Sequence, residues 1–167
     1  MVLDIFDFAR RGALLEGQTA LADFARLLDG LPEQNSRAQV DWRVSGSVNG
    51  QGQMFLHVQA AACPDLVCQR CLGPVAWPVR VDARVQLEVS ESQLDTDDGT
   101  DDSPERILGS TRFDLVSLVE DELILELPYV PRHEQCPEHH ESQDASAEGS
   151  SSGKPSPFAV LDQLRTK

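Results

Sequence analysis

Two short motifs hold the side chains of this sequence that are best suited to metal chemistry. Cys68 and Cys71 are separated by two residues in CQRC, and His133 and Cys136 repeat that spacing further along the chain. A tight turn over a C-x2-C motif lets two thiolates reach one ion, and three cysteines with one histidine form a normal tetrahedral set for structural zinc. The spacing predicts a zinc site, provided that the fold brings the motifs together across the 61 residues between them.

Two other interpretations of the cysteines remain open. In the first, CQRC forms a β-turn whose half-buried thiols bind nothing. In the second, the two thiols carry out redox chemistry, which normally requires a C-x2-C motif at the start of a helix, where the pKa of the first thiol is lowered. Pro74 and Pro78 follow the motif and favour a turn between strands instead. Disulfides are not expected in the reducing cytoplasm.

Three consecutive acidic residues, Glu120, Asp121 and Glu122, lie in a segment with helical periodicity. Successive residues of a helix point about 100° apart, so these carboxylates cannot converge on one substrate atom. We expect them to form a solvated surface or one that faces a protein partner. We also find no Ser/His/Asp arrangement, paired carboxylates or phosphate-binding glycine loop that would support hydrolysis. The sequence therefore predicts a protein without enzymatic activity.

The net charge of −14 is concentrated in one part of the sequence. Residues 91–149 include 17 acidic and 3 basic residues, whereas residues 1–90 include 10 acidic and 8 basic residues. The broad basic footprint of most nucleic-acid-binding proteins is absent. Direct contact with RNA would have to use Arg70, Arg80 and Arg84 in the near-neutral first half. The acidic segment favours a basic protein partner instead.

Alternating apolar and polar residues predict a β-sheet between residues 39 and 90. The dipeptide Asn49-Gly50 is typical of a hairpin turn between two of its strands. The alternation over residues 75–89 predicts one long, half-buried strand that bends near Pro78. These patterns together indicate an antiparallel sheet of three or four main strands.

Helical periodicity occurs on both sides of the predicted sheet. Residues 6–9 begin an apolar patch, and residues 19–28 have apolar side chains at three- and four-residue spacing before Gly30 and Pro32. A second helix is expected over residues 114–127, with Asp114 as its N-cap and Pro128 ending it. The predicted fold class is α+β, a mainly antiparallel β-sheet with one N-terminal and one C-terminal packing helix.

The remaining segments set the expected domain organisation. Residues 1–134 are predicted to form a single α+β domain with a mobile acidic loop at 91–105. That loop resembles part of a calcium-binding loop but lacks the closing glutamate in its proper place, which favours a solvated loop. Residues 135–157 are rich in Ser, Glu, Gly and Pro and predict a disordered linker. In the short helical motif at 158–167, Phe158, Leu161 and Leu164 share an apolar face that packs on the domain or binds a partner.

Three segments in combination resemble one known family. They are CQRCLGP, DLVSLVEDELILELPYVPRHEQC and the C-terminal KPSPFAVLDQLRTK, and together they are similar to the YceD family of bacterial large ribosomal RNA subunit accumulation proteins. The resemblance covers residues 60–167 well and the N-terminal third only by general pattern. Some relatives have further cysteines after the helix, whereas this chain has only Cys136 there. That departure bears on metal binding and not on the family.

The resemblance implies a role in the synthesis, processing or accumulation of large-subunit (23S) ribosomal RNA. We expect this role to be exerted by binding, with a ribosome-assembly or RNA-processing protein as the partner. The alternative is a direct RNA-binding or RNA-processing subunit. No apolar stretch is long enough to cross a bilayer and the N-terminus is unlike a signal peptide, so a cytoplasmic protein is expected.

Overall fold

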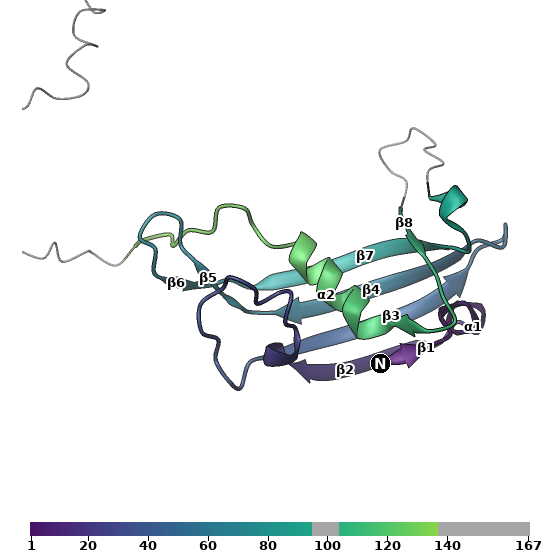
Figure 1. Cartoon of the computed structure of the whole chain (residues 1–167), viewed down its shortest axis with the longest axis horizontal. Coiled ribbons are helices and arrows are strands. Elements are labelled where there is room, and N and C mark those ends of the chain that lie inside the picture. The colour runs from purple at the N-terminus through teal and green to yellow at the C-terminus, as the bar shows by residue number, and fades with distance from the viewer. Residues whose placement is uncertain (95–103, 137–167) are drawn as a thin grey trace, which may run out of the picture. The chain divides into compact units, whose positions relative to one another are not determined.

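Five strands form the main β-sheet of this computed structural model, which describes residues 1–94 and 104–136. They lie in the order β2-β3-β4-β7-β8 (Figure 1). Their bounds are β2 Leu14–Ala20, β3 Gln39–Val48, β4 Met54–Ala62, β7 Val79–Glu88 and β8 Glu105–Leu108. The pairs from β2 to β7 are antiparallel, whereas β7 and β8 run parallel. The predicted α+β class with a mainly antiparallel sheet is confirmed.

Two helices pack on the same face of this sheet. The helix α1 (Ile5–Arg10) lies against β3 and β4, and α2 (Leu115–Leu125) lies across β4 and β7 (Figure 1). Both helices give buried side chains to one core cluster that also holds alternate residues of the strands. The Asp114 carboxylate accepts the N–H of Val116, which confirms the predicted N-cap of α2. None of the helices in the described ranges has the length and apolarity that a bilayer crossing requires.

The hairpin of β3 and β4 confirms the prediction from Asn49-Gly50. The N–H of Asn49 donates to the carbonyl of Gln53, and the Asn49 side chain accepts the N–H groups of Gln51 and Gln53. The positive φ of 82° belongs to Gly52, so the turn is longer than the two-residue turn that the dipeptide suggests. The resulting register pairs Val44 with Val58, and both side chains are fully buried.

The single strand predicted over residues 75–89 is two strands in different sheets. The strand β6 (Pro74–Ala76) pairs with β5 (Asp65–Val67) in a small hairpin, and β7 begins only at Val79. Pro78 has no N–H to donate, and Trp77 directs its N–H to the carbonyl of Pro64 at 2.9 Å. The bend expected near Pro78 is therefore a complete break, and the CQRC motif lies in the loop of the small hairpin.

The prediction of a helix over residues 19–28 is wrong. The strand β2 continues to Ala20, and only a 3-10 turn at Leu21–Asp23 follows before irregular turns. The apolar side chains still reach the core, because Leu21, Phe24 and Leu27 are all buried. The N–H groups of Arg26 and Leu27, which a helix would direct to carbonyls four residues earlier, donate instead to a carboxylate of α2. The N-terminal packing helix is α1.

The two ends of the acidic loop predicted at 91–105 have regular structure. A 3-10 turn spans Glu91–Gln93, and Glu105 is already the first residue of β8. Residues 95–103, which hold most of the calcium-like sequence, lie outside the described residues, as do residues 137–167. The linker, the C-terminal motif and the domain boundaries therefore stay predictions. A short pair of strands, β1 (Val2–Leu3) and β9 (Phe113–Asp114), completes the described fold.

Candidate metal centre

The CQRC motif forms a tight knuckle between β5 and β6. The N–H of Cys68 donates to the carbonyl of Gly73 at 2.9 Å, and the N–H of Leu72 donates to the carbonyl of Cys68 at 2.8 Å. Leu72 has a φ of 61°, in the left-handed region that the reversal of the chain requires. Leu66 and Val75 from the flanking strands form a small apolar cluster with Cys68 and fix the base of the knuckle. Both thiols are thus directed to the same side.

The second motif reaches the knuckle from the segment that follows α2. The N–H of Gln69 donates to the carbonyl of Pro131 at 2.8 Å, and this bond holds the segment beside the first motif. Leu127 and Cys136 pack against the same small cluster as Cys68. The sheet and α2 therefore bring the two motifs side by side, although 61 residues separate them in the sequence.

The four donor atoms of Cys68, Cys71, His133 and Cys136 lie within 4.8 Å of one another. The Sγ atoms of Cys68 and Cys136 are 3.7 Å apart, and the Nδ1 of His133 is 3.4 Å from Cys71 Sγ and 3.9 Å from Cys136 Sγ. Ordinary zinc bond lengths give tetrahedral edges of about 3.8 Å between sulfurs and about 3.5 Å between sulfur and nitrogen. The three spacings lie within about 0.4 Å of those edges, so this set of donors can close around a zinc ion.

A backbone carbonyl sets the orientation of the histidine ring. Nε2 of His133 lies 3.0 Å from the carbonyl oxygen of Pro74, which can only accept a hydrogen bond. Nε2 therefore carries the proton. Nδ1 keeps its lone pair, which faces the sulfurs and is the atom that can ligate a metal ion. Metal-ligating histidines are usually held in this way by an acceptor on the other ring nitrogen.

The local hydrogen bonds favour the ionised form of the buried thiol. Burial of Cys68 opposes ionisation, but N–H groups of Cys71 and Arg70 and a hydrogen bond with His133 lower the pKa of the Cys68 thiol to about 5. The hydrogen bond with Cys68 in turn raises the pKa of His133. The thiolate is the form that ligates metal, and Cys68 is already favoured in that form. At Cys71 the N–H of Gly73 favours the thiolate, but burial and the neighbouring thiols outweigh it and raise the pKa of the Cys71 thiol.

The structure separates the two alternative interpretations of the cysteines, which are redox chemistry and thiols that bind no metal. No helix of the described residues begins at the CQRC motif, which lies between two strands, so the redox interpretation loses its structural basis. The fourth cysteine of the chain, Cys63, is exposed and is not part of the cluster. Thiols that bind no metal remain the competing interpretation of Cys68, Cys71 and Cys136.

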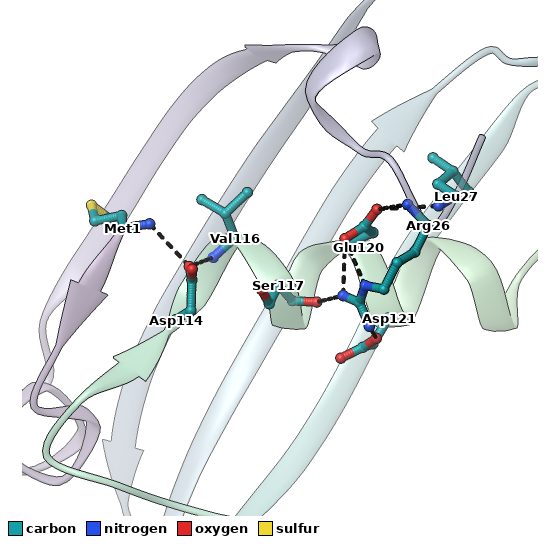
Figure 2. A network of polar contacts seen from close by, with 8 residues as sticks. All are labelled: Met1, Arg26, Leu27, Asp114, Val116, Ser117, Glu120 and Asp121. Atoms are coloured by element: carbon teal, nitrogen blue, oxygen red, sulfur yellow. Dashed lines mark hydrogen bonds and ion pairs between the residues drawn. The ribbon is translucent and has the colours of Figure 1, made fainter. Parts of the chain in front are cut away.

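The acidic residues of α2 do not form one solvated face. Glu120 and Glu122 are buried, at 8% and 7% exposure, and only Asp121 is exposed. Glu120 accepts the backbone N–H groups of Arg26 and Leu27 at 2.7 and 3.1 Å, and its second oxygen accepts Nε of Arg26 (Figure 2). The solvated surface expected at these residues is therefore wrong for Glu120 and Glu122, because α2 turns both toward the rest of the fold. Partner binding stays a prediction, with Asp121 as its exposed residue.

The arginine side chain of this network spans one turn of α2. Its guanidinium also pairs with Asp121 and donates to the carbonyl of Ser117 at 3.1 Å (Figure 2). Arg26 was not among the residues predicted to be functional. The only signal for it was an arginine inside an apolar pattern that did not become a helix.

The three arginines considered for RNA contact are divided between two places. Arg80 and Arg84 are exposed on the face of β7 away from the helices, with the Arg84 guanidinium 4.1 Å from the centroid of the Phe55 ring. Arg70 instead lies in the knuckle, where its side chain contacts Cys136. A shallow depression beside Arg80 is also lined by Glu16, Asp41, Arg43 and Asp82, so acidic residues balance the basic ones there. Phe158, Leu161 and Leu164, predicted to bind a partner, lie outside the described residues.

Comparison with known proteins agrees with the resemblance noted in the sequence. The profile of a family described as "Large ribosomal RNA subunit accumulation protein YceD" matches residues 56–165, a span that includes all four candidate metal ligands. A protein of Haemophilus influenzae with that same description is 33% identical over 181 aligned positions, which cover 100% of this chain and 96% of the relative. No solved structure matches this chain. The chain therefore belongs to the YceD family.

Proposed function

We propose that this protein supports the accumulation of large-subunit ribosomal RNA as a non-enzymatic factor that acts by binding. The observation that carries the proposal is the Cys3His cluster in a chain of this family. All four tetrahedral positions are supplied by protein side chains, which is typical of structural zinc and leaves no open position for a substrate. Such a centre would hold the chain around it in one conformation, and this fixed surface is what a binding partner would recognise.

Zinc is the cofactor that we assign to the cluster. Cys68, Cys71, His133 and Cys136 would hold the ion, and the ion would supply a crosslink between the β5–β6 hairpin and the segment after α2. Two hydrogen bonds support the ligand set, because one fixes the tautomer of His133 and another holds the segment at Pro131. The crosslink would set the place from which the chain continues beyond Cys136.

The partner that fits the charge distribution is a basic protein of ribosome assembly or ribosomal RNA processing. Residues 91–149 hold 17 acidic and 3 basic residues, and complementary potentials raise association rates and suppress wrong partners. Asp121 is the exposed acidic residue of α2 and belongs to the surface that we assign to this partner. We place the protein in the cytoplasm, where ribosome assembly takes place in bacteria and where free cysteines stay reduced.

Direct RNA binding is the second candidate, and one observation favours it. Arg80 and Arg84 are exposed on one face of β7, four residues apart, with Asp82 between them on that face. The acidic neighbours of Arg80 reduce the local positive potential, and the chain as a whole has a net charge of −14. We therefore rank protein binding above RNA binding.

Capture of the tagged full chain from cells tests both candidates. A protein partner held by a specific interface should stay bound when the salt is raised, whereas direct contact with RNA should be lost by about one log unit per phosphate contact per decade of salt. Retention of RNA alone, with that steep salt dependence, would contradict the proposal. Phe158→Ala should reduce capture of the protein partner, because one buried aromatic side chain dominates a small interface.

Complementation tests the biological role. Cells that lack the protein should have a low ratio of large- to small-subunit ribosomal RNA, and the wild-type chain should restore it. Cys68→Ser should fail to restore the ratio, whereas Cys63→Ser, a change at the exposed cysteine outside the cluster, should succeed. A normal ratio in cells without the protein would contradict the proposed function itself.

A further inference from the structure

Arg70 contacts both halves of the candidate metal centre. Its backbone N–H is directed at the sulfur of Cys68 in the first motif. Its side chain reaches the second motif, where Nε lies 2.9 Å from Cys136 Sγ and Nη2 lies 3.2 Å from the carbonyl oxygen of His133. One guanidinium thus spans the second motif from its first residue to its last.

We propose that Arg70 is a positioning residue of the metal centre and not an RNA contact. The inference rests on the zinc site assigned above and extends it to a residue outside the ligand set. In this role Arg70 holds the His133–Cys136 turn in its ligating geometry and compensates the charge of the centre. Two of its N–H groups, at Nε and Nη2, are directed at the sulfur of Cys136 and the carbonyl of His133, so contacts within the protein set the orientation of the side chain.

The charge balance of the centre supports this role. A divalent cation with three thiolates and one neutral imidazole has a net charge of −1, and the guanidinium of Arg70 brings that charge to zero. A hydrogen bond from a cation to a sulfur favours the thiolate form that ligates metal, and loss of such outer contacts commonly costs about 10–100-fold in metal affinity.

Cys136 is the ligand that most needs such a contact. Cys68 and Cys71 are held by the backbone hydrogen bonds of the knuckle, and His133 by the carbonyl of Pro74. In the described part of the chain, the only side chain outside the ligand set that hydrogen-bonds Cys136 is that of Arg70. Loss of Arg70 should therefore affect Cys136 more than the other two cysteines.

Zinc affinity of the full-length chain measures the effect. Competition with a chromophoric chelator should give a zinc affinity about 10–100-fold weaker for Arg70→Ala than for the wild type. Arg70→Lys keeps the charge but cannot donate in the two directions of the guanidinium fork, so it should lie between them. Arg132→Ala is the matched control, and it should stay within about twofold of the wild type. It removes an exposed positive charge next to His133, and in the described part of the chain the Arg132 side chain has no hydrogen bond or ion pair with the four ligands.

Alkylation of the zinc-loaded protein separates positioning from a general loss of stability. Limited treatment with iodoacetamide, followed by mass spectrometry of peptides, should find faster modification of Cys136 in Arg70→Ala and in Arg70→Lys, with Cys68 and Cys71 still protected. Equal modification of all three cysteines in Arg70→Ala would mean that this variant is unfolded. Equal modification of all three in Arg70→Lys as well would contradict a positioning role for Arg70.

Failure of this inference is distinguishable from failure of the proposed zinc centre. A wild-type chain that binds zinc, together with an Arg70→Ala chain of equal affinity, overturns the role of Arg70 alone. A wild-type chain that binds no zinc overturns both. Reduced binding of large-subunit ribosomal RNA by Arg70→Ala, with unchanged zinc affinity, would return Arg70 to the RNA-contact role.

Discussion

At the scale of single residues, two acidic side chains of α2 have opposite relations to the fold. The carboxylate of Glu120 accepts two backbone N–H groups and the Nε of Arg26, so its charge is compensated inside the protein. Burial raises the pKa of Glu122, and the nearby acidic groups of Glu105, Asp121 and Glu126 raise it further. The sequence could not separate the two, because helical periodicity gives the direction of a side chain but not the loop that packs against it.

Truncation of Glu120 should destabilise the protein. Glu120→Ala leaves the N–H groups of Arg26 and Leu27 without their acceptor in a buried setting, which should cost about 2–3 kcal/mol in the free energy of unfolding. Urea denaturation followed by tryptophan fluorescence measures the loss. Asp121→Ala is the control, since it removes only an exposed ion pair with Arg26 and should cost less than about 1 kcal/mol. Equal losses in the two variants would contradict a buried acceptor role for Glu120.

Replacement of Glu122 should stabilise the protein instead, and the gain in stability should depend on pH. The folded state holds Glu122 at a pKa above its unfolded value near 4.5, so as the pH rises through this range the unfolded state ionises first and stability falls. Glu122→Gln removes that loss. Its Tm should equal that of the wild type near pH 4 and exceed it at pH 7, whereas Glu126→Gln, at an exposed position, should show no such divergence. A Glu122→Gln chain that is less stable than wild type at pH 7 would count against the argument.

At the scale of elements, the sequence correctly predicted the strands and caps whose structure depends on the local residue pattern alone. The alternation in β3 and β4 and the cap at Asp114 are confirmed, because each depends on neighbouring residues. The segment over residues 19–28 was misassigned because its three-residue apolar spacing suits a helix and a series of tight turns equally. Pairing of β2 with β3 and the hydrogen bonds to Glu120 decide between them, and both come from distant parts of the chain. The parallel pairing of β8 is likewise invisible in a four-residue strand.

The close approach of α1 to β3 gives a test at this scale. A Cβ at Gly46 would lie 2.6 Å from the Cα of Ala9 and 2.8 Å from the carbonyl oxygen of Phe8, both of which are backbone atoms. Gly46→Ala should therefore destabilise the fold by about 1–3 kcal/mol through a forced shift of α1. Gly50→Ala is the matched control, because nothing lies within 4 Å of its Cβ position. Thermal unfolding of both variants measures the difference, and a Gly46→Ala chain as stable as Gly50→Ala would contradict the packing of α1 on β3.

At the scale of the whole molecule, the candidate metal centre lies where the β5–β6 hairpin meets the segment that follows α2. The four ligand residues were predicted from spacing alone, because C-x2-C and H-x2-C motifs set the local geometry of each half. Their meeting could not be predicted, since it depends on the break at Pro78 and on the path of the chain after α2. Arg70 was assigned to RNA for the same reason, as the sequence does not reveal that its side chain contacts Cys136.

Metal removal should lower the stability of the whole domain. An ion present at about 1,000 times its dissociation constant adds about 4 kcal/mol to the folded state, so a strong chelator should lower the Tm of the zinc-loaded wild type by roughly 10 °C or more. Cys136→Ser should have a low Tm that no longer responds to chelator, because one of the four ligands is lost. Cys63→Ser should respond as the wild type does, since its side chain is exposed and outside the cluster. A wild-type Tm that is the same with and without chelator, in protein shown by elemental analysis to contain no zinc after growth in zinc-supplemented medium, would establish the thiols as unligated. The two halves would then be held together by the hydrogen bonds of Gln69, His133 and Arg70 and by apolar packing.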